Sequence, residues 1–102
     1  MLDLHIAFTA EVNNYPLGPI PSKLKRVMSA EVLEDVSRRY GVSVETLKAH
    51  TRFHKDVEAR QAAMWELRQR TSLSSPQIGR ILGGRDHSTI LHGIRRHAER
   101  MA

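Results

Sequence analysis

The run from Gly83 to His92, GGRDHSTILH, constrains the fold of this chain more than any other segment. Glycine accepts positive φ angles and ends helices, whereas an aspartate that accepts backbone N–H bonds begins them. Gly83 and Gly84 therefore predict the end of one helix, and Asp86 predicts the start of the next. Two helices joined by so short a turn form a helix-turn-helix motif.

Apolar spacing and capping residues predict helices along most of the chain and no strand. A capping box is expected at Ser74, because Gln77 follows it three residues later. Gly79 inside that helix suggests a close approach to a neighbouring helix, and His50 to Asp56 are expected to form a loop. The expected helices run from about Ala30 to Tyr40, from the cap Ser43 to about Ala49, from about Val57 to Arg70, from the cap Ser74 through Leu82, and from His87 to near the C-terminus.

The first 28 residues are expected to form an N-terminal tail or arm, and residues 29–102 the folded domain. Pro16, Pro19 and Pro21 disfavour a helix in the tail. The N-terminus lacks the basic region of a signal peptide, and no apolar stretch reaches the roughly 18 residues of a membrane span. We therefore expect a cytoplasmic protein that does not bind membranes.

The net charge of +5 is concentrated in the second half of the chain. Residues 1–28 carry three basic and two acidic side chains, and residues 29–51 carry three basic and four acidic ones. Residues 52–102 carry ten basic and five acidic side chains. A clustered basic excess suits a polyanion such as nucleic acid. Many solvated helices are also basic, so charge alone does not decide the partner.

The last predicted helix carries one polar stripe next to its start. With Asp86 as the N-cap, helical spacing aligns the polar side chains of Ser88, Thr89, His92 and Arg96. The apolar residues Ile90, Leu91, Ile94 and Ala98 are expected to face inward. In helix-turn-helix proteins the second helix reads bases with its N-terminal residues. The alternative is an ordinary surface helix with a polar first turn.

At this point the sequence resembles the DNA-binding domain of the bacterial replication initiator DnaA. The resemblance covers about Ser29 to Arg100 and includes GGRDHSTILH, a preceding loop from Thr51 to Glu58, and the pair Arg60-Gln61 that begins a long helix. It implies a TrpR-like, all-α helix-turn-helix fold. The printed sequence contains no GxxxxGK[ST] loop, so we expect neither the initiator's ATPase module nor enzymatic activity.

The resemblance also implies a role for nine residues. Arg52 matches a position that enters the minor groove, and the major-groove base contacts fall on Asp86, His87 and Ser88. Phosphate contacts fall on Arg60, Gln61, Pro76 (through its backbone), Thr89 and His92. Two departures should weaken phosphate attraction or contact: Ser88 replaces the usual Thr, and the loop contains Asp56 and Glu58. These acids could also hold Arg52 in an intramolecular pair.

The sequence thus predicts a protein that binds double-stranded DNA at DnaA-box-like sites and regulates replication initiation or transcription. The alternative is a protein-interaction module that binds the initiator or another replication protein. No metal or other cofactor is expected, because the chain has no Cys and neither His87 with His92 nor His50 with His54 has a well-placed carboxylate. No nucleophile, base and orienting group share a spacing that would support catalysis or a small-molecule substrate.

Overall fold

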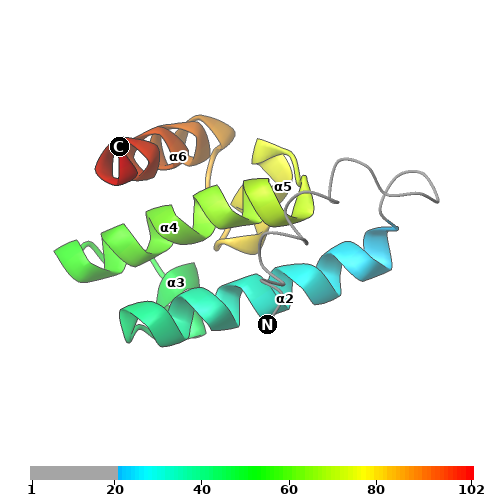
Figure 1. Cartoon of the computed structure of the whole chain (residues 1–102), viewed down its shortest axis with the longest axis horizontal. Coiled ribbons are helices and arrows are strands. Elements are labelled where there is room, and N and C mark those ends of the chain that lie inside the picture. The colour runs from blue at the N-terminus through cyan, green and yellow to red at the C-terminus, as the bar shows by residue number, and fades with distance from the viewer. Residues whose placement is uncertain (1–20) are drawn as a thin grey trace.

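The computed structural model describes residues 21–102, which form five helices and no strand. Figure 1 shows α4 lying between α2 and α6. The all-α expectation is confirmed, whereas the tail predicted for residues 1–28 lies mostly outside the described residues. The helices are α2 (Ser22–Tyr40), α3 (Val44–Lys48), α4 (His54–Thr71), α5 (Ser75–Ile81) and α6 (His87–Met101).

The core is built around α4. Ala59, Ala63 and Leu67 are fully buried, and they meet Val36 of α2 and Ile90 of α6 in one apolar cluster. Alanine side chains on α4 let its neighbours approach closely. Burial of an aliphatic side chain contributes about 1.5–3 kcal/mol, so this cluster is the main stabilising element of the bundle.

Helix α2 begins earlier than the sequence predicted. The expected start was about Ala30, at the predicted domain boundary, but the helix begins at Ser22, after Pro21. Proline suits this position because its φ is fixed near helical values and its missing N–H is not needed there. Ser29 is instead inside the helix, where its hydroxyl donates to the carbonyl of Lys25 at 2.6 Å.

Helix α4 also begins earlier, at His54 rather than Val57. The segment expected to be a loop up to Asp56 therefore contains the first turn of this helix. Asp56 favours the positive N-terminal end, and His54 Nε2 lies 2.9 Å from the Glu58 carboxylate one turn later. Local pairs of this kind stabilise a first turn.

Helix α6 begins at His87 after the cap Asp86, as predicted, but its inward face is rotated from the expected one. Ile90 is buried and Ile94 packs against the core, whereas Leu91 and Ala98 are exposed. The inner positions are Ile90, Gly93 and His97, whose spacing of three and four residues lies on one helical face. The ring of His97 packs against Trp65 of α4, with centroids 5.6 Å apart.

A buried carboxylate joins α2 to α4. Glu66 of α4 accepts hydrogen bonds from Arg39 of α2 and, at 3.2 Å, from Arg70. Arg70 also donates to Asp35 at 3.0 Å. These pairs fix the orientation of α2 against the helix that carries the core.

Candidate nucleic-acid interface

The first turn of α6 presents polar side chains on the surface. Ser88 donates its backbone N–H to Asp86 at 3.0 Å, and its hydroxyl donates to the same oxygen. The side-chain bond and then the backbone bond from Ser88 lower the pKa of Asp86. His87, Thr89 and His92 are exposed, so the predicted polar stripe faces solvent. Asp86 is thus held as a charged acceptor at the start of the helix.

Two glycines in the left-handed region form the turn before α6. Gly83 has φ 81° and Gly84 has φ 77°. The N–H groups of Gly84 and Arg85 both donate to the carbonyl of Gly79, at 2.9 and 2.8 Å. A Cβ on Gly79 would lie 2.1 Å from the carbonyl oxygen of Arg85. The expected neighbour of Gly79 was another helix: the nearest neighbour is this turn, and Ile90 of α6 comes next, 3.7 Å from the same Cβ.

Arg85 connects the same turn to the end of α3. Its guanidinium donates to the carbonyls of Leu82 and Ala49, and it lies 3.5 Å from that of Lys48. The last carbonyls of a helix lack partners within the helix and attract cations. Burial first, and then the charge of Arg60, lower the pKa of Arg85. This role of Arg85 was not predicted from the sequence, although Arg85 directly follows the glycine pair.

Arg60 holds the segment after α3 from the inside. It is buried, and it donates to the carbonyls of Leu47, Thr46 and Thr51 at 3.0, 3.0 and 3.1 Å. A fourth bond, at 3.1 Å, goes to the hydroxyl of Thr51. Burial lowers the pKa of Arg60, and Asp56 partly opposes that shift. Arg60 therefore shapes the loop in addition to any contact with a ligand.

These contacts form a hollow of about 400 Å³ between the loop and the start of α6, which we call the loop–turn hollow. It brings together four of the predicted site residues: Arg52, Arg60, Asp86 and Thr89. The remaining lining residues are His50, Thr51, Val57 and Arg85.

Arg52 is exposed at this hollow, and no ion pair joins it to another residue of 21–102. Its two acidic neighbours act elsewhere. Glu58 pairs with His54, and Asp56 acts on Arg60. The intramolecular pair considered for Arg52 is therefore not formed in this part of the chain.

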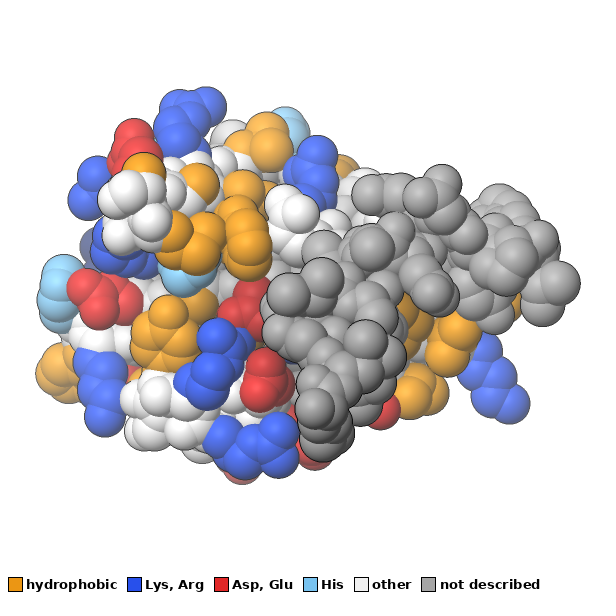
Figure 2. Space-filling view, in the orientation of Figure 1, with side chains coloured by type: hydrophobic (Ala, Val, Ile, Leu, Met, Phe, Trp, Pro, Cys, Tyr) orange, Lys and Arg blue, Asp and Glu red, His pale blue; other side chains and the backbone are white. Residues whose placement is uncertain are grey.

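Other predicted phosphate contacts lie away from the hollow. Gln61 accepts a hydrogen bond from Arg100 at 2.6 Å, which places it where α4 meets α6. Pro76 is exposed in the first turn of α5, next to the capping box that Ser74 and Gln77 form as predicted. On the face shown in Figure 2, Lys and Arg side chains lie among Asp and Glu side chains and form no continuous patch.

Residues 21–102 contain no group of three or more His, Asp or Glu side chains that could hold a metal ion. Among the same residues, no helix combines the length and the apolar character that crossing a membrane requires.

Comparison with known proteins identifies the family. Residues 29–96 match the family described as "Bacterial dnaA protein helix-turn-helix". The chromosomal replication initiator proteins DnaA of Chloroflexus aggregans and Chloroflexus aurantiacus are 38% and 42% identical to 92% of this chain. That of Herpetosiphon aurantiacus is 37% identical over 83% of it.

The chain spans only 22% of the length of the Chloroflexus relatives and 18% of the Herpetosiphon one. No solved structure matches it. The family match covers the helix-turn-helix, the Arg52 loop and the Arg60-Gln61 pair. The chain therefore belongs to the family of the bacterial DnaA helix-turn-helix domain.

Proposed function

We propose that this chain binds double-stranded DNA at sites of the kind that DnaA recognises, as a nucleoid-associated protein of the cytoplasm. It regulates replication initiation or transcription and has no ATPase activity of its own. One observation carries the proposal: Arg85 fixes the exposed first turn of α6 against the segment that leads to Arg52. The first turn of α6 and the segment with Arg52 are thus held at a fixed separation, which would allow them to enter two adjacent grooves of one duplex.

In the proposed complex, the N-terminal turn of α6 enters the major groove. Asp86 accepts from a cytosine amino group, and His87 and Ser88 face neighbouring base edges. Thr89 and His92, which are exposed on the same helix, contact phosphates. The positive end of the α6 dipole adds to this attraction for the backbone.

Arg52 enters the adjacent minor groove in this proposal. A narrow, A/T-rich minor groove concentrates negative potential, which an inserted arginine reads without contacting a unique base pattern. Arg52 is available for this role because it is exposed and has no ion pair with residues 21–102. Its loop is held by Arg60 through the two bonds to Thr51.

The three remaining phosphate contacts are compatible with the internal bonds of these residues. Four of the five guanidinium N–H groups of Arg60 are used internally, which leaves one on Nη1 for a phosphate at the hollow. Gln61 accepts with its carbonyl oxygen, so its amide group remains a donor. Pro76 has no N–H of its own, and the N–H of Gln77 donates to the Ser74 hydroxyl at 3.3 Å. A phosphate at this position would therefore bind the N–H of Ser75, the first residue of α5.

A matched pair of histidine variants in α6 tests the proposal in a gel-shift titration with a DnaA box and a scrambled duplex. His87→Ala should lose about 1–3 kcal/mol of discrimination between them, because a base contact is removed. His92→Ala should weaken both duplexes equally, because it removes a phosphate contact. Full discrimination by His87→Ala would contradict its base-reading role, and a wild type that does not discriminate would contradict the function.

A second candidate is a module that binds the replication initiator, with DNA binding only residual. The observation that favours it is the exposure of Phe53, 74%, and of Leu91, 43%, since large exposed apolar side chains can anchor a protein partner. Adding purified initiator to the same titration separates the two. A complex with the initiator that needs no box and that Phe53→Ala abolishes would support the second candidate.

A further inference from the structure

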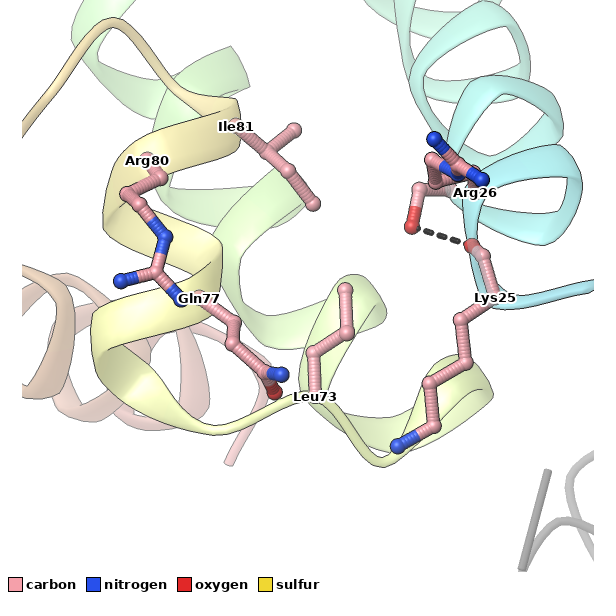
Figure 3. A pocket seen from close by; sticks show the side chains of 7 residues that line it. Lys25, Arg26, Leu73, Gln77, Arg80 and Ile81 are labelled. Atoms are coloured by element: carbon pink, nitrogen blue, oxygen red, sulfur yellow. Dashed lines mark hydrogen bonds between the residues drawn. The ribbon is translucent and has the colours of Figure 1, made fainter. Parts of the chain in front are cut away.

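A second hollow, of about 550 Å³, lies between α2 and α5. The resemblance to DnaA assigns no DNA contact to the residues that line it. Figure 3 shows Lys25 and Arg26 of α2 on one side, Gln77, Arg80 and Ile81 of α5 on the other, and Leu73 between them. Ser29 completes the lining. We call this the α2–α5 hollow. None of its lining residues is acidic.

None of the three cations of this hollow forms an ion pair with an acid among residues 21–102, and three such cations line one hollow that contains no acidic side chain. Elsewhere on α2, Arg38 and Arg39 both pair with Asp35, at 3.8 and 3.4 Å. On α6, Arg96 pairs with Glu99 at 3.3 Å. Lys25, Arg26 and Arg80 line the hollow without such partners, so an anion at the hollow would meet charges that are not already neutralised.

The floor of the hollow is apolar, whereas its rim is cationic. Leu73 is buried and Ile81 is half-buried, so they offer an apolar surface. The Gln77 carbonyl oxygen accepts from the N–H of Ser74 at 2.9 Å, which leaves the Gln77 amide group as a donor near the cations. A cationic rim above an apolar floor fits a phosphodiester chain, whose phosphates alternate with deoxyribose rings.

The position of the hollow in the motif points to DNA. Helix α5 is the first helix of the helix-turn-helix, and in such motifs this helix crosses the DNA backbone. Gln77 is adjacent in sequence to Pro76, where the proposed function already places a phosphate. We propose that the α2–α5 hollow binds the DNA backbone beside the box and so extends the protein's footprint along the duplex. This proposal rests on the proposed function.

Contacts of this kind would be independent of sequence. Each phosphate neutralised by a cation releases counterions and steepens the dependence of log affinity on log salt by about 0.9. The flanking backbone would therefore add affinity and salt dependence to box binding without adding discrimination. It would do so only on DNA that extends past the box.

The test compares two duplexes with the same box, one ending at the box and one extended by about one helical turn, roughly 10 bp, on each side. Wild type, Arg26→Ala, Arg80→Ala and their double variant are titrated at several salt concentrations. Arg38→Ala, at the opposite end of α2, is the control with the same change in charge. Arg26, Arg80 and Arg38 are all exposed, and thermal unfolding confirms that each variant is folded.

We expect the wild type to bind the long duplex more tightly and with a steeper salt dependence than the short one. Arg26→Ala and Arg80→Ala should each reduce the slope on the long duplex by about 0.9, and the double variant should lose most of the difference between duplexes. Arg38→Ala should keep that difference. Binding to the short duplex should be unchanged in all of them.

Three results would overturn the proposal: no difference between the duplexes for the wild type, equal losses on both duplexes in the variants, or the same loss in Arg38→Ala. Polyglutamate serves as a polyanion without phosphates. If Arg80→Ala weakens binding to polyglutamate but not to the long duplex, the hollow takes an acidic polypeptide instead. Discrimination of box from scrambled DNA on short duplexes tests the proposed function separately.

Discussion

The guanidinium of Arg85 donates a hydrogen bond to the carbonyl oxygen of Ala49, which joins the turn before α6 to the end of α3. The segment that follows Ala49 leads directly to Arg52. One side chain thus fixes the separation between the start of the recognition helix and the exposed arginine of the loop. Gly83 supports the same contact, because its Cα lies against the carbonyl of Lys48.

Arg85→Ala should therefore reduce both stability and discrimination. Hydrogen bonds from a charged donor contribute about 1.5–3 kcal/mol, and the partial exposure of Arg85 places the expected loss at the lower end. Urea denaturation measures the loss, with the exposed Arg95→Ala as the control. Affinity for the DnaA-box duplex should fall more than affinity for the scrambled duplex, because the separation between the first turn of α6 and Arg52 is no longer fixed. Unchanged discrimination would show that the bond to Ala49 does not position the loop.

The two glycines of the turn should differ sharply in their tolerance of alanine. Both have positive φ, which costs about 1–2 kcal/mol for a residue with a Cβ. At Gly84 nothing lies within 4 Å of the added Cβ, so strain is the whole cost. At Gly83 the Cβ would lie 2.1 Å from the carbonyl oxygen of Lys48, which adds about 1–3 kcal/mol for the displaced backbone. Equal unfolding free energies for Gly83→Ala and Gly84→Ala would contradict this packing.

The local features of the fold could be predicted from sequence because their causes lie within a few residues. The caps at Ser43, Ser74 and Asp86 follow from side chains next to the helix starts. The early start of α2 does not follow from the prolines, because prolines disfavour the interior of a helix but Pro21 can directly precede one.

The tertiary roles of charged residues could not be predicted in the same way. Arg85 reaches Ala49 and Arg60 reaches Thr46 across 36 and 14 residues of sequence, so no local pattern reveals these bonds. The inward face of α6 was also misjudged, since Leu91 is apolar but exposed and His97 is polar but buried. Its true inner face depends on Trp65 and Met64 of α4, which receive His97 and Gly93.

Arg60→Ala should combine a loss of stability with a loss of DNA affinity. The carbonyls of Leu47 and Thr51 lose the donor that Arg60 supplies, whereas that of Thr46 keeps the N–H of Ala49, and an unsatisfied buried group costs about 1–3 kcal/mol. The variant should also weaken box and scrambled duplexes equally and reduce the salt slope by about 0.9. Arg60→Lys keeps the charge but not the fork of donors, so it should restore part of the slope and little of the stability. A variant that loses stability but keeps the wild-type slope would show that Arg60 is purely structural.

Arg52→Ala should weaken binding to A/T-rich duplexes more than to G/C-flanked ones, because a minor-groove arginine reads groove width and potential. The measurement uses two duplexes that differ only in the A/T tract. Glu58→Gln is the matched control, since Glu58 pairs with His54 rather than Arg52. Equal losses on both duplexes would remove the minor-groove role. No loss on either would favour the protein-interaction candidate.

His97 should make the stability of the bundle depend on pH. Its ring is buried against Trp65, and its Nδ1 has no hydrogen-bond partner among residues 21–102. Burial first, and then the charge of Arg100, lower the pKa of His97 below 6.5; Glu66 opposes this and Arg39 adds to it. Above pH 6.5 the histidine is neutral in both the folded and the unfolded chain, and its contribution to stability is fully present.

As the pH falls below 6.5, the unfolded chain takes up a proton that folded His97 does not, so the free energy of unfolding decreases until the lower, folded pKa is reached. One proton can produce a slope of at most about 1.4 kcal/mol per pH unit. Urea denaturation between about pH 8 and pH 5 should show this decrease in the wild type and a flatter profile in His97→Gln. His92→Gln, on the same helix but exposed, should keep the wild-type slope. Parallel profiles for wild type and His97→Gln, whatever their offset, would show that the buried imidazole does not couple folding to pH.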